Sequence, residues 1–208
     1  MLEQEKKLIL EYLEKLFPNA KCELNFDNGY QLIVSVILSA QCTDKRVNQT
    51  TPALFNKYPS FFDLATAKQS DVEELIKPCG FYHNKAKNII ACSKAVVEKY
   101  NGKLPNTVQE MMTLPGVGMK TAKVVCGDLY GSNVIAVDTH VKRVSNRLGL
   151  VKEDNPDKIS EKLEKIFADN ISGVHHRFVL FGRYVCKAQK PMCSECELKS
   201  ICKYYKKV

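Results

Sequence analysis

The stretch Leu114-Pro115-Gly116-Val117-Gly118-Met119-Lys120-Thr121-Ala122 joins two segments of helical apolar spacing and is the most informative part of the chain. Its two glycines, separated by one residue, predict a tight turn between helices. Around Gly116, Val117 and Gly118, phosphate oxygens can approach the backbone, and the amides that begin the second helix would face such an anion. The alternative for a bare Gly-x-Gly is a plain turn in which glycine ends a helix.

Helical periodicity extends over the remaining sequence and predicts an all-α protein. Near the N-terminus Ile9, Leu13, Leu16 and Phe17 fall on one helical face, and Pro18 ends that helix. The nearly continuous apolar run 32–38 fits a central buried helix better than a strand, since no alternating partner strand follows. Two capping boxes, Ser70-x-x-Glu73 and Thr107-x-x-Glu110, each predict the start of a helix. Asn101-Gly102 is predicted to end a helix that runs from about His83 to Tyr100. Asn155-Pro156 is predicted to begin a helix that reaches about Ala168.

Composition favours a soluble intracellular protein that binds a polyanion. The 208 residues are 45% hydrophobic, enough for a real core, and carry a net charge of +8. An excess of that size favours nucleic acid first and an acidic membrane surface second. No segment reaches the roughly 18 apolar residues needed to span a bilayer, and the mixed-charge start lacks the apolar region of a signal peptide.

Nine cysteines need an explanation, because disulfides are rare in a reducing compartment. The last four form the pattern Cys186-x6-Cys193-x2-Cys196-x5-Cys202. Four thiolates at such spacing suit a tetrahedral metal or a cubane cluster, and zinc is in general the commoner choice for four cysteines. The other five are scattered through apolar or mixed surroundings and are predicted to be small buried residues: Cys22, Cys42, Cys79, Cys92 and Cys126.

Two residues near the hairpin are candidates for chemistry. Lys120 falls in the first turn of the second helix, where the positive end of the helix dipole and partial burial would favour the neutral amine. A neutral, positioned amine is a nucleophile that forms Schiff bases, whereas a charged one pairs with phosphate. Lys123 competes for the same role, and physical reasoning alone does not separate the two. Asp138 is predicted first as the N-cap of a helix from Thr139 to about Arg147.

The full hairpin string resembles the helix-hairpin-helix of the base-excision DNA glycosylases, in particular the endonuclease III branch, and the resemblance spans nearly the whole chain. It matches Lys120 to the family's catalytic lysine and Asp138, in Val137-Asp138-Thr139-His140, to its catalytic aspartate. The implied role of the aspartate is to stabilise positive charge on the sugar and to help activate the amine. The 6-2-5 spacing matches the family's [4Fe–4S] signature, so the resemblance favours an iron–sulfur cluster over zinc, with the ligands Cys186, Cys193, Cys196 and Cys202.

The same resemblance implies groups that touch or enter DNA. Gln41 matches a residue that fills the gap left by an extruded nucleotide, and Phe81 matches a wedge in a second intercalating loop. The alternatives are an ordinary helix end at Gln41 and a core aromatic at Phe81. His140 would line the pocket that receives the extruded nucleotide; the alternative is a partly exposed histidine on its helix. Lys187 and Lys190 would contact phosphate, less strongly than in other family members because they are the only charged residues of their loop.

The fold implied by the resemblance is two α-helical domains with DNA in the cleft between them. A six-helix barrel would cover about residues 22–132, with the helix-hairpin-helix at about 107–130. Residues 1–21 and 133–208 would form the iron–sulfur cluster domain.

The function implied by the resemblance is that of a bifunctional DNA glycosylase and AP lyase. It would excise oxidised pyrimidines from duplex DNA through a Schiff base on Lys120 and cut abasic sites on the 3′ side by β-elimination. The protein is expected to be a monomer with no membrane partner. Its expected location is the cytoplasm, of the bacterial type, in association with the nucleoid.

Two other functions stay open. A monofunctional adenine glycosylase of the same superfamily would lack the hairpin lysine and carry an added C-terminal domain, so Lys120 and the end of the sequence at Val208 argue against it. A non-catalytic DNA-binding module with a structural metal site would contain zinc instead of iron and would form no covalent adduct with DNA.

Overall fold

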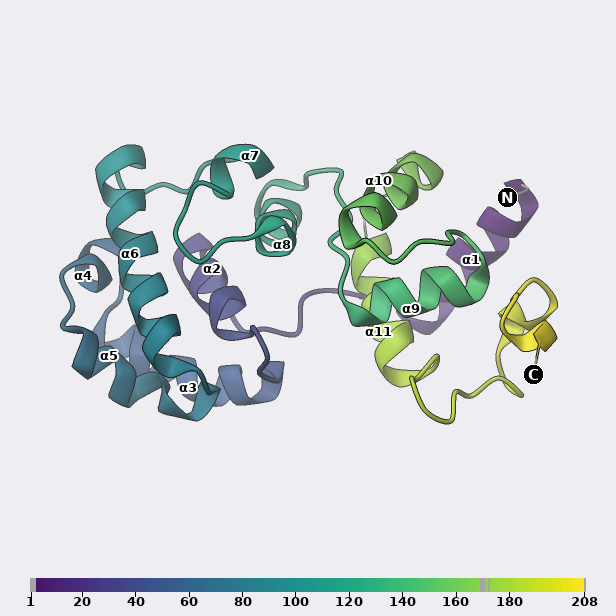
Figure 1. Cartoon of the computed structure of the whole chain (residues 1–208), viewed down its shortest axis with the longest axis horizontal. Coiled ribbons are helices and arrows are strands. Elements are labelled where there is room, and N and C mark those ends of the chain that lie inside the picture. The colour runs from purple at the N-terminus through teal and green to yellow at the C-terminus, as the bar shows by residue number, and fades with distance from the viewer. Residues whose placement is uncertain (1–2, 169–170, 172, 208) are drawn as a thin grey trace. The chain divides into compact units, whose positions relative to one another are not determined.

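The computed structural model of the chain, shown in Figure 1, describes residues 3–168, 171 and 173–207. Its regular structure is helical throughout these residues, which confirms the predicted all-α class. The chain divides into two compact units, one formed by Glu23–Tyr130 and the other by Met1–Cys22 together with Gly131–Val208. None of the described helices is long and apolar enough to cross a lipid bilayer.

The unit Glu23–Tyr130 is built around one apolar helix, α2 (Gly29–Leu38). Residues 32–38 are all buried, so the predicted central helix is confirmed. A helix with no polar face must be surrounded, and α2 packs against α3, α6 and α8 (Figure 1). The other elements of this unit are α3 (Asp44–Lys57), α4 (Phe61–Ala65), α5 (Gln69–Ile76), the 3-10 helix η1 (Lys77–Cys79), α6 (Tyr82–Tyr100), α7 (Val108–Met111) and α8 (Met119–Tyr130).

Two helix ends in this unit follow the predicted capping chemistry. Thr107 Oγ1 accepts a hydrogen bond from the amide of Glu110 at 3.2 Å, which places the start of α7 where the sequence predicts it. α6 ends at Tyr100 and is followed by Asn101 and Gly102, both in the left-handed region of backbone conformation. Asparagine and glycine adopt that region at the lowest cost, so the local sequence sets this helix end.

The predicted capping box at Ser70 is wrong. α5 begins at Gln69, two residues before the start that an N-cap at Ser70 implies, and it has no side-chain cap. Gln69 Nε2 donates to Glu73 Oε1 at 2.7 Å, and His83 Nδ1 lies 2.8 Å from Glu73 Oε2. The Glu73 carboxylate therefore pairs with side chains and does not reach back to a backbone amide.

The other unit packs the N-terminal helix against helices from the second half of the chain. Its core contains Ile9 and Leu13 from the first helix together with Phe167, Phe178 and Phe181. The elements of this unit are α1 (Glu3–Leu16), α9 (Thr139–Leu148), α10 (Pro156–Ile166), α11 (Val174–Tyr184) and the 3-10 helices η3 (Glu197–Ser200) and η4 (Tyr205–Lys207). α1 stops before Pro18 as predicted, whereas α10 stops at Ile166, two residues before the predicted end.

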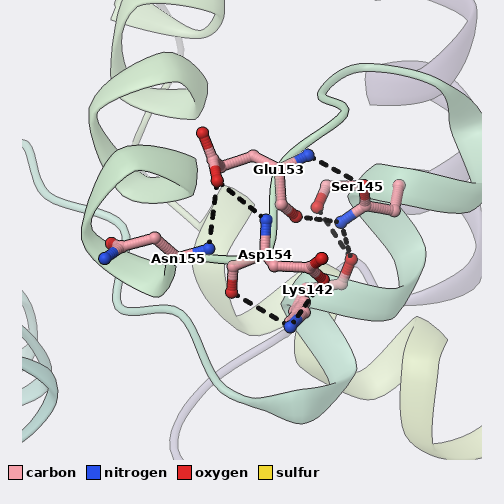
Figure 2. Close-up of polar contacts among 6 residues, drawn as sticks. Lys142, Ser145, Glu153, Asp154 and Asn155 are labelled. Atoms are coloured by element: carbon pink, nitrogen blue, oxygen red, sulfur yellow. Dashed lines mark hydrogen bonds and ion pairs between the residues drawn. The ribbon is translucent and has the colours of Figure 1, made fainter.

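A polar network fixes the loop between α9 and α10 (Figure 2). Lys142 Nζ donates to the carbonyl oxygen of Asp154 and pairs with its Oδ1, each at 3.0 Å. Asn146 donates to the carbonyl oxygen of Glu153 at 3.0 Å and accepts from its amide at 3.3 Å. Glu153 Oε1 accepts hydrogen bonds from the amides of Asn155 and Asp154, which lower the pKa of that carboxyl. The network determines where α10 starts relative to α9.

The scattered cysteines divide into two groups. Cys79, Cys92 and Cys126 are buried, as predicted. Cys22 and Cys42 are half-buried, so the prediction of burial is wrong for them. Both lie outside helices, where the backbone turns and fewer neighbours cover a side chain.

Candidate functional site

The predicted helix-hairpin-helix consists of α7, the turn 112–118 and α8. Gly116 has φ 77°, in the left-handed region that favours glycine, and an added Cβ would lie 2.8 Å from Asn88 Cβ on α6. Val117 is buried. Gly118 differs because its φ lies outside that region and an added Cβ would meet nothing within 4 Å. Nothing among the described residues requires glycine at position 118, and its open side can be approached from outside.

Lys120 lies in the first turn of α8, as predicted, and its side chain is exposed. The partial burial expected for it is therefore wrong for the chain on its own. Lys120 has no hydrogen bond or ion pair with any residue that the structure describes. Lys123 is half-buried and already takes part in an interaction within the chain. The two lysines thus differ in exposure and in partners, and the side chain of Lys120 is the more accessible from solvent.

Gln41 and Phe81 lie on two exposed loops of the same unit. Gln41 (φ 54°) is in the turn after α2, and Phe81 (φ 46°) immediately precedes α6. Phe81 is 66% exposed, which rules out a core position for its ring. Non-glycine residues in the left-handed region cost roughly 1–2 kcal/mol each, so tertiary contacts must hold both loops in place.

A buried lysine joins these two loops. Lys85, on α6, is only 5% exposed, and its Nζ donates to the carbonyl oxygens of Leu38 at 2.9 Å and Cys79 at 2.8 Å. These carbonyls belong to the end of α2 and to η1, so one ammonium group bridges the segments that precede Gln41 and Phe81. Burial lowers the pKa of Lys85. Lys85 was not predicted from the sequence as a functional residue, although it falls on the apolar face of α6 four residues before the buried Ile89.

A cavity of about 820 Å³ lies in the same unit but away from these loops. Its lining includes Gly29, Tyr100 and Tyr130, which mark one end of α2, α6 and α8. Gln41, Phe81 and Gly118, which are predicted to contact DNA, lie at the opposite ends of the same three helices. The cavity is therefore not part of the candidate site.

Asp138 is the N-cap of α9, as predicted, and belongs to the other unit. Its Oδ1 accepts a hydrogen bond from the amide of Val141 at 2.8 Å. Oδ2 has no hydrogen-bond partner among the described residues. The cap fixes the orientation of the carboxylate and leaves one oxygen for another role, so capping and chemistry are compatible.

His140 and Arg143 follow Asp138 on α9. Arg143 Nη2 lies 3.0 Å from His140 Nδ1 and donates to the carbonyl oxygen of Gly182 at 2.6 Å. Because a guanidinium group can only donate, Nδ1 is the acceptor in this contact. His140 is half-buried, and an added Cβ on Gly182 would lie 2.7 Å from His140 Cβ. α9 and α11 thus approach closely at this point.

The four clustered cysteines follow α11 and are all half-buried. They influence one another electrostatically: burial raises the pKa of the Cys193 and Cys196 thiols, and the neighbouring Cys186 and Cys202 raise it further. The pKa of Tyr12, on α1, is raised chiefly by burial and further by the neighbouring Cys196. Among the described residues, no three His, Cys, Asp or Glu side chains are grouped closely enough to hold a single metal ion.

Arg147, near the end of α9, holds the segment that carries these cysteines. Its Nη1 donates to the carbonyl oxygen of Lys187 at 2.7 Å and lies 3.5 Å from Cys186 Sγ, and its Nη2 donates to the carbonyl oxygen of Ala188 at 3.1 Å. The guanidinium carbon lies 4.2 Å from the ring centroid of Tyr204, a cation–π contact. Neither Arg143 nor Arg147 was identified from the sequence, because a lysine or arginine on an amphipathic helix normally faces solvent.

The two lysines of the cysteine segment, Lys187 and Lys190, are both exposed. Lys190 has φ 48°, so the loop turns sharply at that residue. Both side chains are accessible to an anionic partner, as their predicted role requires.

The sequence model of the HhH-GPD superfamily of base excision DNA repair proteins matches residues 34–169. Endonuclease III of a Synechocystis species is 46% identical over 199 residues, which covers 93% of this chain and 90% of the relative. Endonuclease III of Escherichia coli is 39% identical over 204 residues, 96% of this chain and 95% of the relative. A solved structure of a trapped covalent endonuclease III–DNA intermediate, at 42% identity, matches with a TM-score of 0.93 over 100% of this chain and 98% of that one.

Proposed function

The chain belongs to the endonuclease III family of the HhH-GPD superfamily, and on that premise we propose that it is a bifunctional DNA glycosylase and AP lyase with Lys120 as nucleophile. DNA glycosylase activity follows from the family. The lyase step, the lesion class and the residue roles are the parts that we propose. The observation that carries them is the exposed amine of Lys120, which pairs with no other described residue and lies in the first turn of α8, directly after the hairpin.

The proposed reaction begins with a damaged nucleotide rotated out of the duplex. The amine of Lys120 attacks C1′ of the deoxyribose, and the base leaves with the electrons of the glycosidic bond and takes up a proton. The nitrogen then loses one proton, the C1′–O4′ bond breaks as O4′ is protonated, and the opened sugar is joined to the lysine as an iminium. The iminium acidifies the C2′ proton, and loss of that proton expels the 3′ phosphate by β-elimination. Asp138 stabilises the positive charge that develops on the sugar, using the oxygen that does not cap α9.

The hairpin would bind the phosphate backbone of duplex DNA. Gly118 supports this role because its open side admits an oxygen atom that any larger residue would keep away. Gln41 and Phe81 would enter the duplex, since both are exposed on loops held by Lys85. His140 would lie near the extruded nucleotide, while Lys187 and Lys190 would contact phosphate.

The four cysteines would hold a [4Fe–4S] cluster. One feature of the chain fits this group: Cys186 and Cys202 are close enough to Cys193 and Cys196 to raise the pKa of those two thiols further, beyond the effect of burial. When bound, the cluster would order a segment that has little apolar core of its own. The unit with Asp138 would then be the cluster domain, and Glu23–Tyr130 the helix-hairpin-helix domain.

Borohydride trapping on a duplex with a single abasic site tests the nucleophile. The wild-type chain is expected to yield a stable covalent adduct after reduction of the imine. Lys120→Ala should abolish the adduct, whereas the matched control Lys123→Ala should retain it. An adduct of undiminished yield with Lys120→Ala would refute the assignment.

Two further measurements separate the alternatives. Metal analysis should give iron, about four atoms per chain, whereas a DNA-binding module with structural zinc would give zinc. A panel of duplexes with one lesion each should show excision of oxidised pyrimidines such as thymine glycol. Excision of adenine with no strand cleavage would instead support a monofunctional adenine glycosylase.

A further inference from the structure

The cavity of about 820 Å³ in the unit Glu23–Tyr130 has no role in the proposed reaction. It lies at the ends of α2, α6 and α8 that are opposite to the ends near Gln41, Phe81 and Gly118. Its volume falls within the range of about 300–1,000 Å³ that small-molecule sites have. A ligand bound there would not meet the residues that are predicted to contact DNA.

Aromatic side chains make up much of the cavity lining, and the chain holds several of them in fixed orientations. The rings of Tyr30 and Phe61 pack edge to face with centroids 5.0 Å apart, and Tyr30 Oη donates to the carbonyl oxygen of Tyr58 at 2.6 Å. Tyr130 Oη donates to the carbonyl oxygen of Leu104 at 2.9 Å. Because these two hydroxyl groups are used within the chain, the tyrosines offer a ligand mainly the apolar surface of their rings. The aromatic residues of the lining are Tyr30, Phe61, Phe62, Tyr100 and Tyr130.

Two of these rings remain exposed although they are large. Phe62 is 54% exposed and Tyr130 is 44% exposed. An added Cβ on Gly102 would lie 2.7 Å from Phe62 Cε2, so the absence of a side chain at position 102 lets the ring lie against the backbone. Rings that are held in place and left uncovered can stack with a flat partner such as a nucleic acid base.

The charged groups of the lining come from one short stretch of the chain. Lys103 and Asn106 lie in the loop before α7, and Glu110 lies on α7. Of the described residues in the lining, Lys103 is the one cation and Glu110 the one carboxylate. The side chains of Lys103 and Asn106 have no hydrogen bond or ion pair with any other residue that the structure describes. Glu110 Oε2 accepts a hydrogen bond from Thr107 Oγ1 at 2.7 Å, which leaves Oε1 available to a ligand.

These groups select a ligand by both charge and shape. The ammonium group of Lys103 requires an anion, and the rings favour a flat heterocycle. The carboxylate of Glu110 requires a hydrogen-bond donor, whereas the amide of Asn106 can donate and accept, as the polar edge of adenine does. An aromatic amino acid has a ring and both charges, but it leaves the Asn106 amide without a partner and fills less of the cavity.

We propose that the cavity binds an adenine nucleotide. Its base stacks on the exposed rings of Phe62 and Tyr130, its exocyclic amino group donates to Glu110 Oε1, and the neighbouring ring nitrogen accepts from the Asn106 amide. Its phosphate pairs with Lys103. A free mononucleotide and the terminal nucleotide of a single strand share this chemistry.

Equilibrium dialysis of the folded, iron-containing protein with deoxyadenosine monophosphate tests the phosphate contact. Lys103→Met should bind this nucleotide about fivefold more weakly than the wild-type chain, the loss expected for one exposed ion pair. Deoxyadenosine, which has no phosphate, should bind both proteins equally. The matched control is Lys94→Met, which removes an exposed lysine of α6 outside the lining and should leave nucleotide binding unchanged.

Two further comparisons test the base. Deoxyinosine monophosphate has an oxygen in place of the amino group and should bind about tenfold more weakly, because that oxygen would face the carboxylate of Glu110. Glu110→Gln should reduce this preference, since an amide can also donate. Phe62→Ala should weaken binding of the nucleotide and of deoxyadenosine by about the same factor of ten, because both stack on the ring.

A 5′-phosphorylated tetramer of deoxyadenosine distinguishes the two sources of the ligand. If Lys103→Met weakens binding of the mononucleotide alone, the ligand is a free nucleotide, and if it weakens both, a strand end also binds. Absence of nucleotide binding by the wild-type chain, or undiminished binding by Lys103→Met, would overturn the proposal, as would displacement of the nucleotide by an equal concentration of tyrosine. Borohydride trapping on abasic duplex should be unchanged in Lys103→Met, so the lyase assignment stands or falls separately.

Discussion

Gly182 on α11 offers a sharp test of how Asp138 is positioned. An added Cβ at Gly182 would lie 2.7 Å from His140 Cβ, 3.1 Å from His140 Cα and 3.2 Å from its carbonyl oxygen. Two of these atoms are backbone, so no side-chain rotation can relieve the contact. Carbon atoms pack at about 3.5–4.0 Å, so Gly182→Ala must move α9 away from α11 by about 1 Å.

The magnitude follows from two opposing effects. Alanine inside a helix is favoured over glycine by about 1 kcal/mol. Overpacking costs about 1–3 kcal/mol, and the bond from Arg143 Nη2 to the Gly182 carbonyl oxygen is disturbed as well. The net loss of unfolding free energy should be about 1–2 kcal/mol, which leaves the protein folded. Because Asp138 caps the same helix two residues before His140, its carboxylate moves with α9, and a shift of about 1 Å can cost about 100-fold in rate.

The assay combines urea unfolding with single-turnover cleavage of a lesion-containing duplex. Gly182→Ala should lose a small part of its stability and a large part of its cleavage rate. His140→Ala added to it should not restore either, because alanine keeps the Cβ, Cα and carbonyl oxygen that form the contact. Wild-type stability together with a wild-type rate in the single variant would refute the close approach of the two helices at this point.

Four other changes test separate parts of the structure. Gly118→Ala should unfold with unchanged or slightly higher free energy in urea, since its Cβ meets nothing within 4 Å, but should bind duplex DNA more weakly in a filter-binding assay. Lys85→Met leaves the carbonyls of Leu38 and Cys79 without a donor and should lower the unfolding free energy by about 2–4 kcal/mol in the same urea assay. Burial raises the pKa of the Cys92 thiol to about 12, so above its ordinary value of 9.0 the folded state binds more protons than the unfolded state. Stability should therefore fall by about 1.4 kcal/mol per pH unit through this thiol, and Cys92→Ala should remove that part of the slope when urea unfolding is measured from pH 8 to pH 11. Arg147→Met should lower the iron content of the purified protein with little change in circular dichroism, because the residue binds two carbonyl oxygens of the cysteine segment.

The sequence predicted best those features that are set by residues close together in the chain. The caps at Thr107 and Asp138 and the end of α6 at Asn101 depend on side chains within three or four residues, and all three are confirmed. The error at Ser70 has both a local and a distant cause, because Gln69 on the same helix and His83 on another helix both hold the carboxylate that the capping box needs. Local chemistry therefore predicts a helix limit unless other side chains compete for the same group.

The candidate site shows the same division. Lys120 and Asp138 could be placed at the start of their helices from sequence, since helix position follows from capping and periodicity. The exposure of Lys120 could not, because it depends on what the rest of the chain leaves uncovered. The bridge that Lys85 makes between the end of α2 and η1 likewise could not be predicted, since it requires two segments from different parts of the unit to meet.

The support for the cysteine segment comes from outside that segment, and this explains why the spacing alone did not predict it. Arg143 Nε donates to the carbonyl oxygen of Cys186 at 3.0 Å, and Arg147 binds the two carbonyls that follow. Both arginines lie on α9, the helix that Asp138 caps. A loop whose backbone carbonyls point at cations on a neighbouring helix keeps its shape with little apolar core. The helix that fixes the candidate catalytic carboxylate is therefore also the helix that orders the start of the cysteine segment.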